Sequence, residues 1–140
     1  MAVIGFNFKS VSASVEENNF KGNININSSP SIENIEKHDL SGVGINEAVS
    51  IDFKFTTSYD QAGKIIFEGQ ILYQVDDAKK VVKQWKDGNK MDDKIALDIL
   101  NTIFRKCLSK SVELADLLRL PPPIRFPVVT VEKPTVSGNE

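Results

Sequence analysis

The chain has 140 residues, a net charge of −2 and a hydrophobic fraction of 41%, which is typical of one globular domain that folds without a disulfide or metal. The near balance of charge argues against a general nucleic-acid binder, which would show a clear basic excess. Cys107 is the only cysteine, and no apolar run reaches the roughly 20 residues needed to span a bilayer. The first residues lack the features of a signal peptide. We therefore expect a cytoplasmic protein without membrane insertion.

Alternating apolar residues predict the first two strands. The alternation runs through residues 4–8 and resumes through residues 11–15 on the opposite parity. A strand with such a break keeps one face inward only if a residue is inserted, so we expect a β-bulge near Lys9-Ser10. After a polar turn, a second alternating run covers residues 20–26 and ends at Ser28-Ser29-Pro30.

The middle of the sequence predicts a loop and then a long hairpin. Residues 30–46 lack a regular period, and we expect a loop that lies over the edge of the sheet. Apolar side chains then occupy the odd positions from 49 to 59 and from 65 to 75, with a short glycine-containing turn at residues 60–63. This pattern is typical of an antiparallel hairpin with a buried face and a polar face.

The period then changes to that of a helix. Asp76-Asp77 opens a short helix that Asp87-Gly88-Asn89 ends, and either Asp92 or Asp93 can cap a second helix that runs to about residue 118. The second helix carries one apolar stripe, which consists of Ala96, Ile99, Leu100, Ile103, Cys107, Leu114 and Leu118.

Prolines mark the end of the long helix. Pro121-Pro122-Pro123 cannot continue it, and residues 124–129 have the pattern of an extended apolar segment. The sequence therefore predicts an α+β fold: a four-stranded antiparallel sheet, a short helix, a long helix and a proline-marked extended crossover. We expect one domain over residues 1–132 and a flexible tail over residues 133–140.

The sequence carries little catalytic equipment. His38, the only histidine, lies in the predicted loop without a recognised catalytic partner, so we interpret it as a solvated residue. Cys107 lies on the apolar stripe, where a buried thiol is inert. Capping explains Asp76-Asp77 and Asp92-Asp93, and a single histidine and a single cysteine argue against zinc. We expect no catalytic residue, no metal and no cofactor, and hence a protein that is not an enzyme.

A basic run surrounds the only tryptophan, Trp85. Its lysines are Lys79, Lys80, Lys83, Lys86 and Lys90. One interpretation is an anion-binding face, and the other is the solvated side of an amphipathic helix. We favour the second, because nearby aspartates dilute the charge. Trp85 itself is either a core anchor or an interface residue.

The order of the predicted elements, together with the segment Leu120-Pro121-Pro122-Pro123-Ile124-Arg125-Phe126-Pro127-Val128, resembles the SecB family of export chaperones. In this segment, prolines bracket alternating apolar residues before a Pro-Val pair, as in the crossover loop of that family. Residues 8–26 look like its first strand, acidic turn and second strand, and residues 52–73 look like its central hairpin.

The resemblance implies a homotetramer, built as a dimer of dimers, that holds unfolded polypeptides in apolar grooves without ATP. By position, the peptide-binding groove would be lined by Phe53, Phe55, Phe67, Tyr73, Ile124, Phe126 and Val128. Glu16 and Glu17 fall near the acidic surface that the family offers to the SecA export motor.

The chain departs from the family after the crossover, because residues 130–140 are too polar and too few to supply the family's second helix. This departure favours general chaperoning over a dedicated export role, and SecB-like proteins that guard antitoxins are a further alternative. The leading hypothesis is an ATP-independent holdase for unfolded polypeptides. The alternative is an oligomeric interaction module with one specific folded partner.

Overall fold

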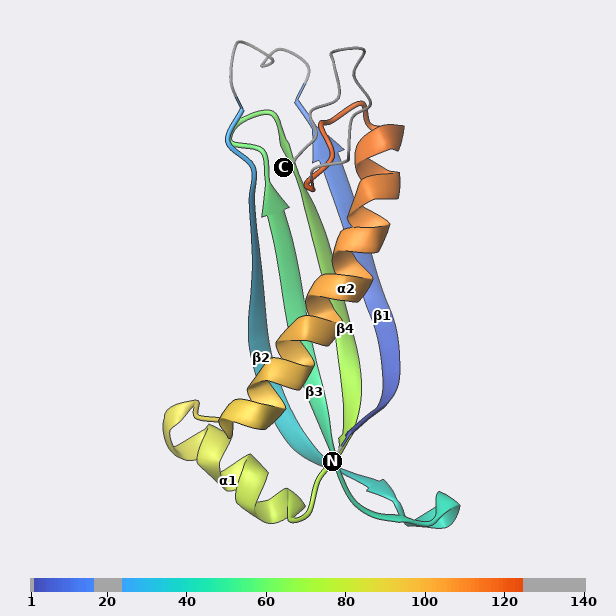
Figure 1. Cartoon of the computed structure of the whole chain (residues 1–140), viewed down its shortest axis with the longest axis vertical. Helices are drawn as coiled ribbons and strands as arrows, with labels where there is room; N and C mark the ends of the chain where they lie inside the picture. The colour runs from blue at the N-terminus through green and yellow to red at the C-terminus, as the bar shows by residue number, and fades with distance from the viewer. Residues whose placement is uncertain (1, 17–23, 125–140) are drawn as a thin grey trace, which may run out of the picture.

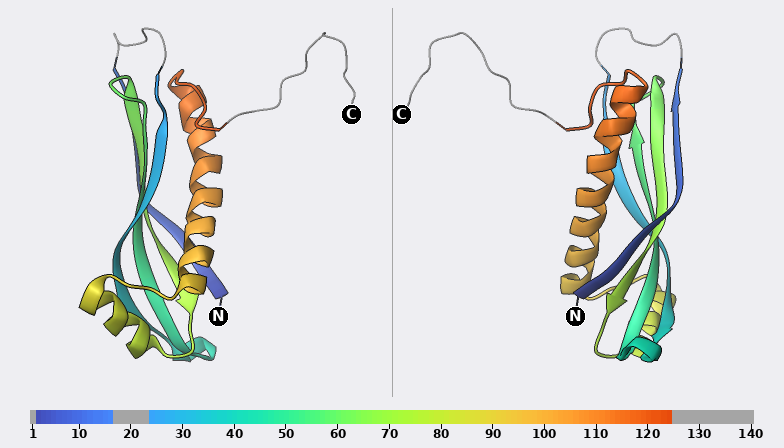
Figure 2. Two further views of the ribbon diagram at one scale, coloured as in Figure 1. Left: turned by 60° about the vertical axis from the view of Figure 1, so that its left-hand side comes forward. Right: turned by 90° about the vertical axis from the view of Figure 1, so that its right-hand side faces the viewer.

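The computed structural model describes residues 2–16 and 24–124. Four antiparallel strands form one sheet in the order β1-β4-β3-β2, and two helices follow. The elements are β1 (Ala2–Val15), β2 (Asn27–Leu40), β3 (Ile45–Ser58), β4 (Gly63–Gln74), α1 (Ala78–Gly88) and α2 (Asp93–Leu117). The long helix α2 crosses one face of the sheet diagonally, and α1 lies beside β2 at one end (Figures 1 and 2). The predicted α+β fold is confirmed.

The predicted bulge in the first strand is present. The pairing of β1 with β4 shifts register between Phe8 and Ser10, so Lys9 is the inserted residue. A second shift between Val3 and Gly5 was not predicted. Each inserted residue shifts the alternation of the strand by one position. As a result, Phe6, Phe8 and the later apolar residues of β1 all point to the same face of the sheet.

The prediction for residues 20–46 was wrong in its main point. β2 spans Asn27–Leu40, so it begins at the point where the sequence pattern predicted that the second strand ends. The first part of the predicted strand, residues 20–23, lies outside the described residues. Pro30 fits because β2 is an edge strand, paired with β3 alone, and an outward-facing position needs no amide donor. His38, predicted in a loop, is a half-buried residue of this strand. Pairing with β3 therefore overrides the weak local pattern.

The hairpin of β3 and β4 is confirmed. Its turn holds Asp60 at a positive φ of 54° and is closed by the Tyr59 amide, which donates to the Gly63 carbonyl at 2.9 Å. One face of the hairpin forms the core of the domain, with no side chain more than 1% exposed. Its residues are Val49, Ile51, Phe53, Phe55, Tyr59, Ile65, Phe67, Ile71 and Tyr73.

Both helices begin near the predicted aspartates, but only one aspartate side chain caps. The Lys80 amide donates to the Asp77 carboxylate at 3.3 Å at the start of α1. Asp92 precedes α2, and its side chain accepts no capping hydrogen bond. The prediction that α2 ends before the three prolines is confirmed: the Leu120 amide donates to the Ala115 carbonyl at 2.8 Å, which closes the last turn.

The apolar stripe of α2 faces the sheet, although its composition differs from the prediction. Cys107 is fully buried, and burial raises the pKa of its thiol to about 12, so it stays protonated. Thr102 and Ser111 are also buried, and each hydroxyl donates to the carbonyl four residues earlier. The buried residues are Ile95, Ile99, Thr102, Ile103, Cys107, Ser111 and Ala115, while Ala96, Leu100, Leu114 and Leu118 are half-buried.

Candidate functional site

The aromatic residues predicted to line a groove lie in the core of the chain. Phe53, Phe55, Phe67 and Tyr73 are at most 1% exposed. They lie on the face of the sheet that α2 covers, since the ring of Phe55 meets that of Phe104 edge-on at 5.4 Å between centroids. In a single chain, a peptide would have to displace α2 to contact these four side chains.

Phenylalanines of the edge strand β1 cover the rest of this cluster. Phe6 stacks against Phe53 with 5.3 Å between centroids, and Phe8 lies 5.2 Å from Phe67. The Lys106 ammonium group lies 5.8 Å from the ring of Phe6, within range of a cation–π interaction. The cluster is therefore bounded by α2 on top and by β1 at its side.

A polar contact fixes α2 on the sheet near its first turns. The Tyr73 hydroxyl donates to the Asp98 carboxylate at 2.6 Å. Burial raises the pKa of Tyr73 above its usual range, and the hydrogen bond to Asp98 adds to the effect. The phenol is therefore a neutral donor at all physiological pH values, and its role here is structural.

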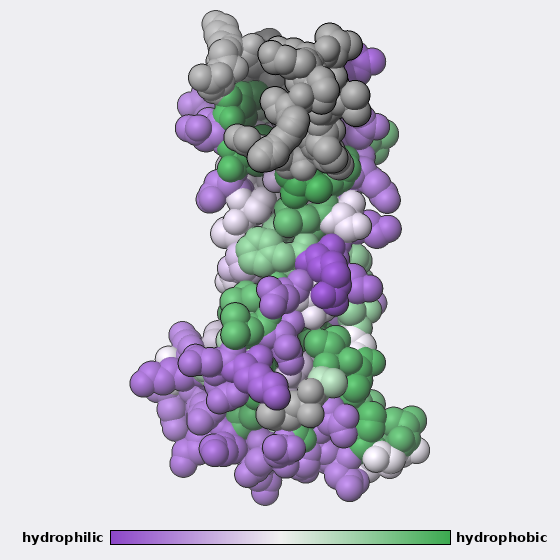
Figure 3. Space-filling view, in the orientation of Figure 1, coloured by the Kyte–Doolittle hydropathy of each residue, from purple (hydrophilic) through white to green (hydrophobic). Residues whose placement is uncertain are grey.

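Apolar side chains become accessible at the C-terminal end of α2. Leu117 is 75% exposed, Ile124 is 38% exposed, and Leu114 and Leu118 are half-buried. We call these four residues the Leu-rich end. Figure 3 shows hydrophilic residues gathered around α1 and hydrophobic residues scattered along the rest of this face. Ile124 is the predicted groove residue that lies on this surface, while Phe126 and Val128 lie outside the described residues.

The apolar surface continues along one side of α2. Leu100, Phe104 and Leu108 recur every four residues and are all half-buried. We call them the apolar flank. Leu97 is 61% exposed at the other end of the helix. The sequence prediction treated Leu100 as core and did not single out Leu97, Phe104, Leu108 or Leu117. The sequence signal that could have identified these four residues is that they are apolar but lie beside the predicted stripe of the helix.

The opposite face of the sheet is polar and mixed in charge. Lys9 lies 3.8 Å from Asp52, and Lys54 stands directly across from Glu68 in the pairing of β3 with β4. Glu16 is exposed just after β1, where its amide donates to the Ala62 carbonyl at 2.8 Å, and Glu17 lies outside the described residues. Positive and negative groups alternate here, so this face lacks a strongly acidic field.

The described residues contain little that could carry out chemistry. Across residues 2–16 and 24–124, no group of three or more histidine, cysteine, aspartate or glutamate side chains could hold a metal ion. No described helix is long and apolar enough to cross a membrane. Accessible apolar side chains on a rigid helix are thus the main feature that this arrangement offers to a partner.

Neither a protein-family model nor a curated protein matches this sequence. Among solved structures, the chain is similar to the SecB-like chaperone Rv1957 of Mycobacterium tuberculosis, which was solved in complex with a ChAD peptide from the Rv1956 HigA1 antitoxin. The similarity has a TM-score of 0.51 at 10% sequence identity and covers 95% of this chain and 91% of that chain. The fold is therefore SecB-like, in agreement with the resemblance seen in the sequence.

Proposed function

We propose that this chain is an ATP-independent chaperone that binds unfolded or extended polypeptides. The observation that carries the proposal is the Leu-rich end, where Leu117 is three-quarters exposed at the point where the chain continues into the apolar segment of Phe126 and Val128. The SecB-like fold supports it, because the similar protein from Mycobacterium tuberculosis holds a peptide.

The surface suits weak and unselective binding of apolar segments. Burying a leucine or phenylalanine side chain contributes about 1.5–3 kcal/mol, and the contribution depends on area and not on sequence. In this proposal, Phe126 and Val128 contact the client together with the Leu-rich end, which includes Ile124. Phe53, Phe55, Phe67 and Tyr73 support α2 from beneath.

The proposal is tested by the ability of the protein to suppress aggregation of a reduced, unfolded model substrate such as α-lactalbumin. We expect Leu117→Asp and Phe126→Asp each to weaken suppression several-fold, because a charge on the surface removes the apolar contact. Val43→Asp is the matched control, since Val43 is 73% exposed but lies in the 3₁₀ turn Ser41–Val43, at the other end of the molecule (Figure 1).

Circular dichroism establishes whether each variant keeps its fold. Folded Leu117→Asp and Phe126→Asp proteins that suppress aggregation as well as Val43→Asp would contradict the proposed surface. We further propose that the protein acts in the cytoplasm as a homo-oligomer. Native mass measurement checks the assembly, and a monomer would argue against this part of the proposal.

The second candidate function is a module dedicated to one partner, such as an antitoxin. It is favoured by the peptide bound to the similar chaperone, which comes from an antitoxin. Binding to several unrelated unfolded proteins supports the holdase, whereas binding to none of them supports the dedicated module. An export role would require an additional contact with a motor such as SecA, for which Glu16 and Glu17 are the proposed residues.

A further inference from the structure

The helix α1 separates its apolar residues from its lysines. Ala78 is fully buried, and Val81, Val82 and Trp85 are half-buried and pack against the hydrophobic core. Trp85, for which the sequence allowed either a core anchor or an interface residue, therefore anchors α1 to the rest of the domain. The domain itself covers the apolar side of the helix, so α1 presents its polar side to a partner.

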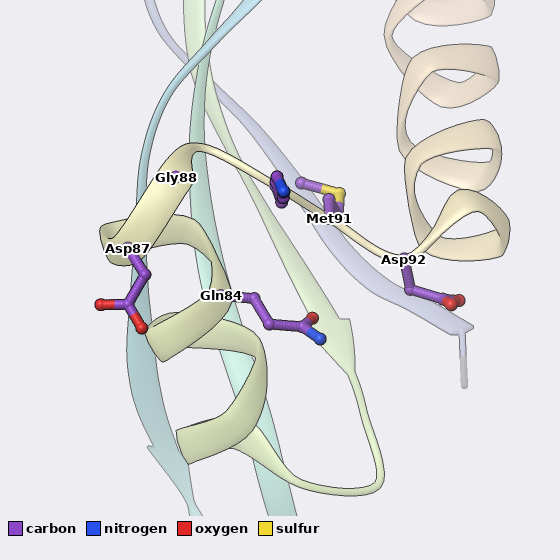
Figure 4. A pocket seen from close by; sticks show the side chains of 6 residues that line it. Gln84, Asp87, Gly88, Met91 and Asp92 are labelled. Atoms are coloured by element: carbon purple, nitrogen blue, oxygen red, sulfur yellow. The ribbon is translucent and has the colours of Figure 1, made fainter.

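Three lysines lie together on the outer side of α1. Lys79, Lys83 and Lys86 are spaced by four and then three residues, which places them on one side of the helix. All three are exposed, and none of them lines the two cavities between α1 and α2. In Figure 4, the side chain of Gln84 extends toward the connection to α2. Each of the three lysines lies at least about 100° around the helix from Gln84, so they face solvent and not α2. We call them the lysine side of α1.

The lysine side is not neutralised by ion pairs. Across residues 2–16 and 24–124, no carboxylate lies within 4.0 Å of these three ammonium groups. Asp87 is the exposed carboxylate that follows them on α1, and Figure 4 shows that it points away from the cavity beside α2. Residues 76–90 contain five lysines and three aspartates, which leaves +2 on a chain whose net charge is −2. The surface around α1 is therefore more basic than the chain as a whole.

Several carboxylates at this end of the molecule are engaged with the backbone. Each accepts a hydrogen bond from an amide: Glu47 from Ala78 at 2.9 Å, Asp77 from Lys80 at 3.3 Å and Asp39 from Ser41 at 3.0 Å. These bonds fix the start of α1 and the turn between β2 and β3. The lysine side is thus presented by an anchored helix.

An exposed apolar turn lies at the same end of the molecule. Val43, in the 3₁₀ turn Ser41–Val43, is 73% exposed, and Leu40 and Ile45 on either side of the turn are half-buried. Figures 1 and 2 show α1 and this turn together at one end, opposite the end where α2 terminates. An apolar tip and a basic helix are therefore available to one partner.

This combination fits a bilayer better than a nucleic acid. Proteins that bind single-stranded nucleic acids stack bases on accessible aromatic side chains, and no aromatic side chain within residues 2–16 and 24–124 is exposed. An anionic bilayer offers negative headgroups for lysines and a hydrocarbon boundary for an apolar side chain. Both features of this end of the molecule then have a counterpart in the partner.

We propose that this end of the molecule docks peripherally on an anionic lipid surface. The lysine side of α1 lies against the headgroups, and Val43 enters the boundary between headgroups and acyl chains. The Leu-rich end then points away from the bilayer, because the 25 residues of α2 rise about 37 Å between the two ends. A client held at the Leu-rich end would stay accessible while the protein is on the membrane.

The test measures co-sedimentation of the full chain with lipid vesicles. Vesicles of phosphatidylcholine with one third phosphatidylglycerol present an anionic surface, and vesicles of phosphatidylcholine alone are the neutral control. We expect at least about tenfold tighter binding to the anionic vesicles, because each lysine near such a surface contributes about fivefold. Binding should weaken between about 50 and about 500 mM salt, since screening shortens the range of the attraction. Equal binding to both vesicles, or binding to neither, would overturn the inference.

The lysine side is tested with the double variant Lys83→Gln and Lys86→Gln, which should bind anionic vesicles at least about tenfold more weakly. The matched control is Lys64→Gln with Lys110→Gln, which makes the same change in net charge at exposed positions at the start of β4 and in the second half of α2. It should bind nearly as well as the wild-type protein. Asp87→Asn removes the carboxylate beside the lysine side and should strengthen binding. Equal losses in the two double variants would mean that only overall charge matters and would refute the proposed surface.

The apolar turn is tested with Val43→Ser, which leaves the charge unchanged. We expect binding to anionic vesicles to weaken several-fold, because the apolar contact with the bilayer is lost. Val11→Ser is the matched control, since Val11 is 51% exposed but lies on β1. Unchanged binding of Val43→Ser would remove the turn from the docking surface and contradict the proposed orientation.

A separate assay distinguishes a bilayer from other anionic partners. Glycerol 3-phosphate at the phosphate concentration of the vesicles should not displace the protein, and displacement would indicate a site for free phosphate. A single-stranded oligonucleotide that binds through Lys83 and Lys86, when vesicles do not bind, would overturn the inference in favour of a nucleic acid. The outcome for the proposed function is read from aggregation suppression: Leu117→Asp should lose suppression and keep vesicle binding.

Discussion

The two faces of the sheet are formed by the same strands and differ in almost every side-chain property. On the face under α2, Phe53 and Phe55 of β3 are at most 1% exposed, while Asp52 and Lys54 on the opposite face are half-buried. One helix is sufficient to cover the first face, and the second is polar enough to meet water. A partner that binds through apolar contacts therefore finds them along α2 and not on the open side of the sheet.

Leu72 is an apolar residue on the otherwise polar open face, and contacts within one chain explain its position. It lies on the open face, yet it is half-buried because it packs over Gly5 of β1, where an added Cβ atom would lie 3.3 Å from a Leu72 methyl group. Its partial burial does not require a second subunit.

The largest loss of stability is expected for Gly69→Ala, which disturbs the packing on the face of the sheet that α2 covers. An added Cβ atom would lie 2.7 Å from Cζ of Phe53 and would also overlap the carbonyl oxygen of Asn7. We expect the free energy of unfolding to fall by about 1–3 kcal/mol, because the aromatic cluster must shift. Urea denaturation followed by circular dichroism measures the change. Gly42→Ala is the control, as no atom lies within 4 Å of its added Cβ, and an equal loss in both variants would contradict the packing described.

Tyr73→Phe tests the polar contact between the covered face and α2. At pH 7 we expect a loss of about 1.5 kcal/mol, typical of a hydrogen bond to a charged group. Tyr59→Phe is the matched control, since the buried Tyr59 hydroxyl has no hydrogen-bond partner within residues 2–16 and 24–124. It should leave stability unchanged or raise it slightly.

The contribution of the Tyr73 hydroxyl to stability should also depend on pH. The folded state raises the pKa of Tyr73 above the unfolded value of 10.0, so its contribution is fully present below pH 10 and is lost as the pH rises further. The difference between the wild-type protein and Tyr73→Phe should therefore shrink above pH 10. Urea midpoints at pH 7 and pH 10.5 measure it, and a difference that grows with pH would be inconsistent with the raised pKa.

The smallest effect is expected on the open face. Lys9 and Asp52 are separated by 3.8 Å, and their side chains are 53% and 39% exposed. Exposed pairs of this kind contribute about 0–1 kcal/mol, so Lys9→Ala should change the free energy of unfolding by less than about 0.5 kcal/mol and become neutral in high salt. Thermal and urea unfolding at two salt concentrations provide the measurement. A loss as large as that of Gly69→Ala would show that the two faces are not as different as described.

Local sequence patterns predicted much of the fold. The alternation in β3 and β4 identified the buried face, and the change of parity in β1 located the bulge at Lys9. Both features follow from the period of two along a strand, which is written in the order of residues alone. The two helices were likewise predicted from period and capping residues.

The sequence predicted a second strand but misplaced it, and it did not predict the accessibility of the candidate site. The residues of β2 have little alternation of their own, and they form a strand because the edge of β3 supplies hydrogen-bond partners. Phe53 and Phe67 were correctly identified as inward-facing, but the pattern could not reveal that α2 and the phenylalanines of β1 cover them. Periodicity assigns a side chain to a face, and only packing decides whether that face meets a partner.

The sequence by itself determined the SecB-like order of elements, the inward face of the hairpin and the inert state of Cys107. Each depends on neighbours along the chain or on simple composition. The tertiary structure decided that the strand aromatics form the core and that the Leu-rich end is accessible. These properties arise from residues that are distant in sequence, such as Phe55 and Phe104, and depend on the diagonal position of α2 on the sheet.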